Sequence, residues 1–315
     1  MAAVASRTRD EIGSQPECWL RAAEEAAGFG PALPRPGERV AVTGCGTSWF
    51  VAQSYAALRE ASGQGVTDAF AASEFPLSRG YDRVVAVTRS GTTTEVLELL
   101  AALEERGGRG ARDRLVVLTA DPGSPVVGAA GRVAVLEYAD ERSVVQTRFA
   151  TSALVFLRAG LERHGGLPSG VGSVAEAVVD AESAVSAVLP SEVVGAGQWT
   201  FLGRGWTYGL ALEAALKSRE AAGAWTEAYP AMEYRHGPIA VAEPGRVVWV
   251  LGEAPAGLRD EVERLGGVVV ADSGPEGWDP LADLVRAQGL AVALAEARGL
   301  DVDRPRNLTR SVVLG

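Results

Sequence analysis

The chain has 315 residues, of which 47% are hydrophobic and 22% charged, and its formal net charge is −10. This length suits two domains of about 150 residues each, and the apolar fraction is ample for buried cores. The acidic balance argues against a general nucleic-acid or anionic-membrane surface. A small phosphorylated ligand would therefore have to be held by local geometry.

The number of cysteines, the spacing of cysteine and histidine, and the length of apolar runs exclude further classes of protein. Cys18 and Cys45 are too few for a disulfide framework, and no Cys/His cluster has the spacing of zinc ligands. No stretch of about eighteen uninterrupted apolar residues indicates a membrane span. We therefore expect a globular cytoplasmic protein with no metal, no cofactor, and no nucleic-acid or membrane partner.

Hydrophobic periodicity predicts alternating helices and strands along the first half of the chain. A helix over residues 17–28 and a Pro/Gly-rich linker over 30–37 precede an apolar strand at 39–43. Further predictions are buried strands at 84–87 and 115–118, helices at 93–105 and 150–163, and a connecting helix around 174–189. This alternation is typical of a parallel sheet with helices on both faces.

The second half of the chain repeats this scheme. Val42-Thr-Gly-Cys-Gly-Thr-Ser48 opens one helix, and Phe201-Leu-Gly-Arg-Gly-Trp-Thr207 opens another. Strands at 247–251 and 268–271, with a helix at 258–265 between them, continue the second series. We predict two tandem α/β domains of doubly wound, flavodoxin-like type. The expected division is a helical arm (1–34), a first domain (35–170), a connecting helix (171–190) and a second domain with the tail (191–315).

Two loops of the first domain place hydroxyl side chains at expected helix starts, over residues 44–48 and 88–94. Free N–H groups at a helix N-terminus, together with Ser and Thr hydroxyls, can cradle a phosphate. The alternative is an ordinary helix cap, for which the same residues are preferred. Neither loop matches a nucleotide P-loop, and the third glycine of the dinucleotide fingerprint is missing.

Lys217 is the only lysine of the chain, against twenty-nine arginines. Arginine can replace lysine wherever a solvated positive charge is enough, but it cannot offer a compact ammonium that exchanges a proton. The position therefore points to a chemical role. The alternative is a leftover surface lysine in a chain of biased composition.

Glu213, Lys217 and Glu220 follow the spacing i, i+4 and i+7, which places all three on one helical face. Two carboxylates would keep the ammonium charged. A carboxylate that reached a substrate could move a proton between adjacent carbons of an open-chain sugar. The alternative is a surface salt-bridge ladder worth a few tenths of a kcal/mol per pair.

Several short motifs occur together in the chain. They are Glu11-Ile-Gly-Ser-Gln15-Pro16, Gly44-Cys-Gly-Thr-Ser48, Ala72-Ser-Glu-Phe75, Arg89-Ser-Gly-Thr-Thr93, Ala211-Leu-Glu-Ala-Ala-Leu-Lys217, Glu227-Ala-Tyr229, Glu233-Tyr-Arg-His236-Gly-Pro238 and Asp301-Val-Asp-Arg-Pro-Arg-Asn307-Leu. In this combination they resemble the sugar isomerase (SIS) domain family over essentially the full length. The resemblance is to the isomerase half of glucosamine-6-phosphate synthase and to related aminosugar-phosphate isomerases and deaminases.

The resemblance implies roles for individual residues. Residues implied to hold the substrate are Thr47, Ser48, Thr88, Arg89, Ser90, Thr93 and Glu213, with the phosphate at residues 88–93. Glu220 is implied to shuttle a proton between C1 and C2, Lys217 to assist at the neighbouring oxygen, and His236 to open the sugar ring. In that family the histidine comes from a second subunit, so a homodimer with a shared active site is expected.

Two departures limit the resemblance. No glutaminase domain with an amino-terminal cysteine is found, so glutamine is not expected to be the ammonia source within this chain. The family's imine-forming lysine of the tail corresponds to Arg310, and arginine cannot form a Schiff base under ordinary conditions. Arg310 either contacts a ligand oxygen or phosphate, which we favour, or lies on the surface.

These residues leave three functions open. Our first hypothesis is an aminosugar-6-phosphate isomerase or deaminase that acts by proton transfer between C1 and C2. The second is an N-acetylglucosamine-6-phosphate dehydratase, in which removal of the C2 proton leads to loss of the 3-hydroxyl. The third is a non-catalytic sugar-phosphate sensor.

Overall fold

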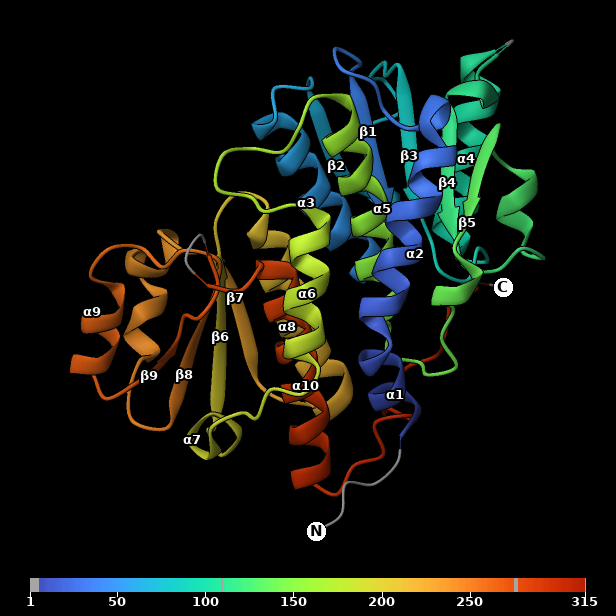
Figure 1. The fold of residues 1–315 in the computed structure, drawn as a ribbon. Coiled ribbons are helices and arrows are strands. Elements are labelled where there is room, and N and C mark those ends of the chain that lie inside the picture. Colours follow the sequence, from blue (N-terminus) through green and yellow to red (C-terminus); the bar gives the residue numbers. More distant parts are fainter. Residues whose placement is uncertain (1–5, 109, 275–276, 315) are drawn as a thin grey trace. The chain divides into compact units, whose positions relative to one another are not determined.

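The computed structural model describes residues 6–108, 110–274 and 277–314. They form two compact units, each built around one parallel sheet (Figure 1). The β1–β5 unit contains Glu17–Glu141, Arg148–Ser169 and the tail from Thr309 on. The β6–β9 unit contains the described residues up to Pro16, then Arg142–Thr147 and Gly170–Leu308.

The sheet of the β1–β5 unit has the strand order β2-β1-β3-β4-β5, with all neighbours parallel. Its strands are β1 (Val40–Gly44), β2 (Thr67–Ala71), β3 (Arg83–Val87), β4 (Leu115–Thr119) and β5 (Arg132–Val135). In the register of β1, which lies between β2 and β3, Val40 is opposite Thr67 on one side and Arg83 on the other. β1 and β4 are buried along their whole length, as expected for strands covered on both faces.

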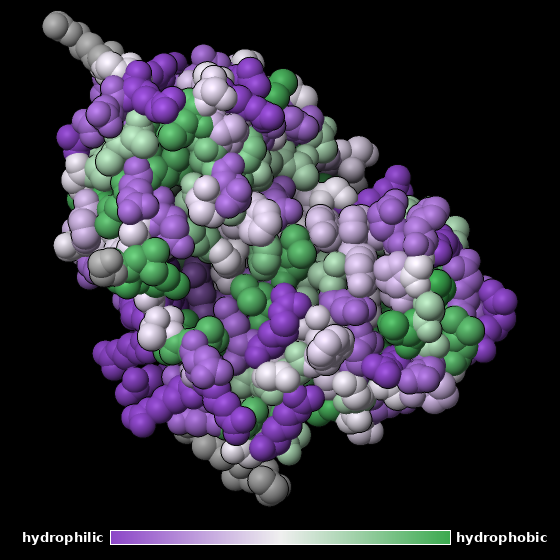
Figure 2. Space-filling model, turned by 180° about the vertical axis from the view of Figure 1, so that it is seen from behind, coloured by the Kyte–Doolittle hydropathy of each residue, from purple (hydrophilic) through white to green (hydrophobic). Residues whose placement is uncertain are grey.

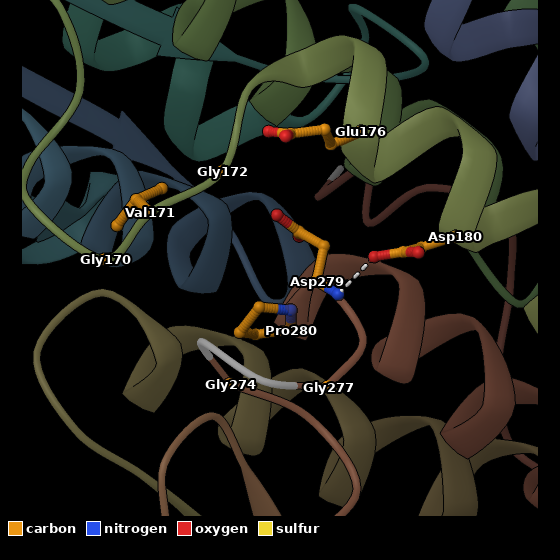
Figure 3. A pocket seen from close by; sticks show the side chains of 9 residues that line it. All are labelled: Gly170, Val171, Gly172, Glu176, Asp180, Gly274, Gly277, Asp279 and Pro280. Atoms are coloured by element: carbon orange, nitrogen blue, oxygen red, sulfur yellow. Dashed lines mark hydrogen bonds between the residues drawn. The ribbon is translucent and has the colours of Figure 1, made fainter.

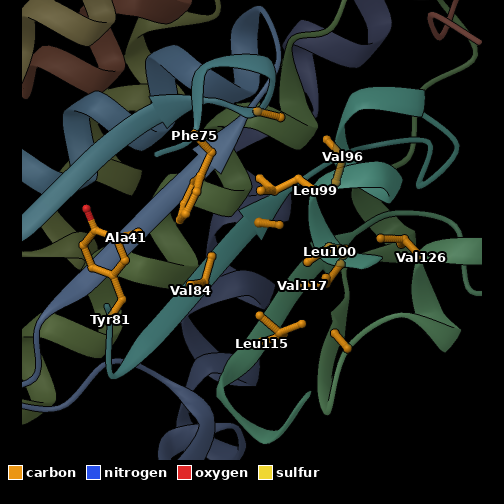
Figure 4. Packing of buried hydrophobic residues seen from close by; sticks show 13 residues of the cluster. Ala41, Phe75, Tyr81, Val84, Val96, Leu99, Leu100, Leu115, Val117 and Val126 are labelled. Atoms are coloured by element: carbon orange, nitrogen blue, oxygen red, sulfur yellow. The ribbon is translucent and has the colours of Figure 1, made fainter. Parts of the chain in front are cut away.

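Helices cover both faces of this sheet. They are α2 (Gln15–Gly28), α3 (Thr47–Ala61), α4 (Thr94–Gly107) and α5 (Arg148–His164). Because side chains alternate along a strand, Val84 and Val117 pack with Leu99 and Leu100 of α4 in one core (Figure 4). α3 packs on β1, β2 and α5. The Trp19 indole N–H donates to the Thr151 hydroxyl at 2.9 Å, which ties α2 to α5.

The sheet of the β6–β9 unit repeats this topology with one strand fewer, in the parallel order β7-β6-β8-β9. Its strands are β6 (Gln198–Gly203), β7 (Thr226–Pro230), β8 (Arg246–Leu251) and β9 (Val268–Val270). The helices of the unit are α1 (Arg7–Gly13), α6 (Val174–Ala184), α7 (Ser191–Val194), α8 (Thr207–Ala222), α9 (Leu258–Arg264) and α10 (Pro280–Ala297). α8 packs against β6, β7 and α10, and α9 contributes Leu258 and Val262 to the core with Val248 and Val250.

Short 3₁₀ helices complete the chain. They are η1 (Gly30–Ala32), η2 (Ala72–Glu74), η3 (Arg112–Arg114), η4 (Pro125–Gly128), η5 (Glu137–Ala139), η6 (Glu233–His236) and η7 (Pro238–Val241). Along the described part of the chain, none of the helices is long and apolar enough to cross a membrane. Hydrophilic residues are spread over the face seen in Figure 2, with apolar residues between them.

The predicted repeat has a common steric cause in both units. A Cβ atom at Gly44 would lie 2.6 Å from the Ser48 Cβ atom, and one at Gly203 would lie 2.2 Å from the Thr207 carbonyl oxygen. Glycine at the end of β1 and of β6 therefore lets the following helix start directly against its strand. The expected α/β architecture of two parallel sheets flanked by helices is confirmed.

Most predicted elements are confirmed to within a few residues. The α-helices and strands of the described residues that were missed are α7, α10 and the edge strands β2, β5 and β7. α1 lies within the expected helical arm but was not predicted as a separate helix. The connecting helix is shorter than expected, because α6 ends at Ala184.

The two units do not follow the expected division in sequence order. The start of the chain belongs to the β6–β9 unit, where the Glu11 carboxylate accepts a hydrogen bond from the Arg142 N–H at 2.6 Å. There the Gln15 amide donates to the Gln288 side chain at 2.8 Å. The tail from Thr309 belongs to the β1–β5 unit. Side-chain hydrogen bonds over long sequence separations, rather than chain order, decide where the two ends pack.

Asp303 holds α1 within the β6–β9 unit. Its carboxylate accepts hydrogen bonds from the N–H groups of Arg7 and Thr8, both at 2.9 Å, and from the Thr8 hydroxyl at 2.8 Å. Burial pushes the pKa of Asp303 upward, but these hydrogen bonds outweigh it, and the pKa lies below its ordinary value of 3.8. The stabilisation is therefore present above pH 3.8 and is lost as the pH falls through the folded-state pKa.

We predict that Asp303→Asn lowers the free energy of unfolding by about 1 kcal/mol at pH 7, because a charged acceptor is lost. The difference from the parent should shrink as the pH falls through the folded-state pKa of Asp303, which lies below 3.8, because the parent carboxylate is then protonated as well. Urea unfolding at pH 7 and at a series of pH values below 3.8 measures this. Asp10→Asn, on the same helix, is the control and should change little. An equal difference at all of these pH values would contradict the assigned role of the charge.

Candidate functional site

The two hydroxyl-rich loops leave adjacent strands of the β1–β5 sheet. The strand order 2-1-3-4-5 reverses direction between β1 and β3, and the carboxyl ends of strands at such a point form the usual ligand crevice. Thr47 and Ser48 begin α3 directly after β1, and Thr88 follows β3. A Cβ atom at Gly44 would lie 2.9 Å from the Val87 carbonyl oxygen, so the two strand ends are close together.

The loop over residues 88–94 carries a connected set of hydroxyls. The Ser90 hydroxyl oxygen accepts a hydrogen bond from the Thr92 N–H at 3.3 Å and lies 3.0 Å from the Thr92 hydroxyl. Thr93 occupies the N-cap position of α4 with extended backbone, yet its side chain makes no capping hydrogen bond. Among the described residues, the Thr93 hydroxyl therefore does not cap α4, contrary to the ordinary-cap alternative. The geometry of the loop favours the ligand interpretation.

The Arg89 side chain is buried and is bound by other groups of the protein. Its guanidinium lies 3.1 Å from the Glu141 carboxylate, and the two side chains are 3% and 0% exposed. A second guanidinium nitrogen donates to the Arg310 carbonyl at 3.0 Å. A buried arginine paired in this way fixes the loop, because breaking a buried ion pair is costly.

Arg310 is directed to protein acceptors as well. Its guanidinium donates to the Asp140 carboxylate and to the Glu141 carbonyl oxygen. The neighbouring Ser311 hydroxyl lies 3.0 Å from the hydroxyls of both Ser90 and Thr92, although the sequence argument did not single out Ser311. Its one sequence signal was its place directly after Arg310 in the tail motif.

The carboxylate–lysine–carboxylate row forms on α8 as predicted. The Lys217 ammonium lies 2.5 Å from a Glu220 oxygen and 3.5 Å from a Glu213 oxygen. Lys217 and Glu213 are 1% and 2% exposed at their side chains, whereas Glu220 is 20% exposed. The surface-ladder alternative is therefore wrong. Glu220 is the member of the row that solvent or a ligand can reach.

His236 lies at the end of η6 and is exposed. Among the described residues, no hydrogen bond or ion pair joins it to Glu213, Lys217 or Glu220. The structure therefore assembles two sets of predicted residues, each within one unit: the loop set around residues 47–48 and 88–93, and the α8 row. The role of His236 stays a prediction.

A separate cavity of the β6–β9 unit has the wrong charge for a phosphate. It has a volume of about 450 Å³ and is lined by Glu176, Asp180 and Asp279 from α6 and the start of α10 (Figure 3). The Asp279 N–H donates to the Asp180 carboxylate at 2.7 Å. Like charges would repel an anion here. Over the described residues, no group of three or more His, Cys, Asp or Glu side chains is placed to hold a metal ion.

Comparison with known protein families identifies a family match for part of the chain. Residues 35–159 match the SIS domain, and the match begins in the linker before β1 and ends in α5. Over these residues the resemblance predicted from the motifs is confirmed.

Curated relatives also match part of the chain. The chain is 33% identical over 164 residues to the glutamine–fructose-6-phosphate aminotransferase (isomerizing) of Gloeobacter violaceus and 33% identical over 174 residues to that of Aeropyrum pernix. These matches cover 44% and 47% of this chain, but only 27% and 28% of the relatives. The shared region is thus a fraction of those larger proteins.

Solved structures match the chain along nearly its whole length. Glucosamine-6-phosphate deaminase from Thermotoga maritima is 25% identical with a TM-score of 0.82, covering 98% of this chain and 100% of that one. The C-terminal domain of glucosamine-fructose-6-phosphate aminotransferase from Francisella tularensis is 20% identical with a TM-score of 0.71, covering 96% and 99%. The second likeness shows a shared fold.

We predict that Lys217→Met lowers the free energy of unfolding by about 3 kcal/mol, because it removes a buried ammonium from between two carboxylates. Glu220→Gln keeps the more deeply buried Glu213–Lys217 pair and should cost about 1 kcal/mol. Urea unfolding of both variants tests this order. Equal losses of unfolding free energy in the two variants would mean that the buried Glu213–Lys217 pair does not stabilise the protein more than the contact with Glu220.

Cys45, in the loop between β1 and α3, should react slowly with alkylating agents at neutral pH. Burial, assisted by the Glu95 carboxylate, raises the pKa of this thiol to about 11. We expect the rate of iodoacetamide labelling to rise about tenfold per pH unit up to roughly pH 10, since only the thiolate reacts. Cys45→Ser, which retains the buried Cys18, gives the background. A plateau near pH 9 would contradict the shifted pKa.

Proposed function

We propose that the chain is an aminosugar-6-phosphate isomerase/deaminase that works by proton transfer between C1 and C2 of an open-chain hexosamine 6-phosphate. The observation that carries this proposal is the row of Glu213, Lys217 and Glu220 on α8, in which the exposure of the side chains differs. A buried ammonium holds two carboxylates, and only Glu220 is accessible enough to act as a base. The T. maritima deaminase supports the choice of substrate class, since its likeness extends over 98% of this chain.

The phosphate is assigned to the hydroxyl loop. Ser90 and Thr93 are the half-buried hydroxyls of the 88–93 turn, and Thr47, Ser48 and Thr88 are the buried hydroxyls at the adjacent strand ends. Rotatable hydroxyl donors and the N–H groups at the start of α4 suit a dianion. Since the Arg89 side chain is engaged with Glu141, its contribution to phosphate binding is through the position of the loop.

The proton chemistry is assigned to Glu220 and Lys217. Glu220 removes the C2 proton, and the electron pair moves through an enol-type intermediate to the C1 oxygen, where the Lys217 ammonium stabilises the developing charge. The same carboxyl group returns the proton to C1, which gives the ketose form. With a free amine at C2 the product is a ketimine, and water then releases ammonia.

Three further assignments complete the proposal. His236 opens the sugar ring and is supplied by a second subunit, so the active form is a homodimer. Glu213 keeps Lys217 charged and in place, 3.5 Å from its ammonium. The β6–β9 unit is a second SIS domain, by analogy of its strand order with that of the unit that contains the family match.

The second candidate is an N-acetylglucosamine-6-phosphate dehydratase. It uses the same base, but an acetylated nitrogen leaves poorly, and the intermediate instead expels the C3 hydroxyl. Arg310 favours this candidate over nitrogen transfer, because the tail has no lysine for an imine and its guanidinium is held by Asp140. A sugar-phosphate sensor would bind the same ligands without proton exchange.

Incubation with glucosamine 6-phosphate and with its N-acetyl form in deuterated water separates these functions. We expect deuterium at C2 and release of ammonia from the free amine. An ultraviolet-absorbing product from the acetylated sugar would instead establish the dehydratase. Binding without any deuterium incorporation would leave only the sensor.

We predict that Glu220→Gln lowers the rate of deuterium exchange by at least about a hundredfold, because the general base is lost, while sugar-phosphate binding persists. Isotope exchange followed by NMR and calorimetric titration measure the two effects. Glu182→Gln, an exposed glutamate of α6, is the matched control. Retained exchange in the Glu220 variant would assign the base elsewhere.

A further inference from the structure

We propose that the C-terminal tail is an internal competitor for the phosphate site of the 88–94 loop, an inference that rests on the proposed function. All atoms involved belong to the β1–β5 unit. The tail places two oxygen acceptors, the Ser311 hydroxyl and the Val312 carbonyl, on groups that would otherwise bind an anion. A phosphate can then enter only when this part of the tail leaves.

The Ser311 oxygen is in the position of a ligand oxygen. It accepts hydrogen bonds from the Ser90 and Thr92 hydroxyls, each at 3.0 Å, and lies 3.4 Å from the Thr93 hydroxyl. A hydroxyl has a single proton to donate. When Ser90 and Thr92 point their protons at Ser311, those protons are not available to a phosphate.

The Val312 carbonyl occupies the helix terminus in the same way. The N–H of Thr94, the first residue of α4, donates to this carbonyl at 3.3 Å. The N–H groups of a first helical turn are the ones that bind anions. The tail thus satisfies both the hydroxyl donors and a backbone donor of one anion site.

Reciprocal contacts hold the tail there. The Leu314 N–H donates to the Thr94 hydroxyl at 2.9 Å, and the Arg89 guanidinium donates to the Arg310 carbonyl at 3.0 Å. Arg310 adds its hydrogen bonds to Asp140 and Glu141. Yet the side chains of Val312, Val313 and Leu314 are more than half exposed, so little apolar burial opposes release. Such a contact suits a displaceable segment.

The test is calorimetric titration of the full chain and its variants with inorganic phosphate. Ser311→Ala removes the competing hydroxyl, and we expect roughly fivefold tighter binding, because the binding-competent fraction rises. Arg310→Ala loosens the tail without touching the loop hydroxyls and should act in the same direction. Val313→Ala, an exposed tail residue, is the matched control and should leave the affinity unchanged.

A second measurement follows the tail itself. On saturation with phosphate, hydrogen exchange at the Leu314 amide should accelerate as the tail leaves Thr94. Weaker phosphate binding by Ser311→Ala would make the tail a wall of the site and overturn the proposal. Unchanged affinity in both variants, with unchanged exchange at Leu314, would overturn it while leaving the phosphate site intact. Absence of phosphate binding in every variant would refute the loop assignment, and with it this inference.

Discussion

Parallel pairing of β1 with β3 is the constraint on which the candidate site depends. It brings the carboxyl ends of two central strands side by side, so that the loops after Gly44 and Val87 open on the same edge of the sheet. The steric demand at Gly44 then starts α3 immediately after β1. Without that pairing, the hydroxyls near residues 47 and 90 would have no reason to gather.

The interior strands of each sheet could be predicted because buried strands have continuous apolar sequences. β4 reads Leu-Val-Val-Leu-Thr and is buried throughout, whereas the edge strand β7 reads Thr-Glu-Ala-Tyr-Pro and is half exposed. An edge strand is covered less and needs no apolar run, so β2, β5 and β7 gave no signal. α10 was missed for the opposite reason: it is buried on nearly all sides and therefore lacks an amphipathic period, although Asp279 and Pro280 mark its start.

Contacts of the site between residues close in sequence could be predicted, whereas contacts between residues far apart in sequence could not. Spacing along one helix was enough to bring Glu213, Lys217 and Glu220 together, since helical geometry fixes neighbours at i+3 and i+4. The engagement of Arg89 with Glu141 joins residues 52 positions apart. The contact of Ser311 with Ser90 spans 221 positions. No periodic pattern encodes such partners, so only the fold reveals that the arginine is already occupied.

The exchange of chain ends between the two units has a consequence for synthesis on the ribosome. The β6–β9 unit incorporates α1, which precedes both sheets along the chain, and the β1–β5 unit incorporates the tail, which follows both sheets. A nascent chain therefore carries an unpartnered α1 until the β6–β9 sheet is translated, and the hydroxyl loop stays uncovered until the tail has been added. Cutting the gene between the two sheets would likewise yield fragments that each lack a piece of their own fold.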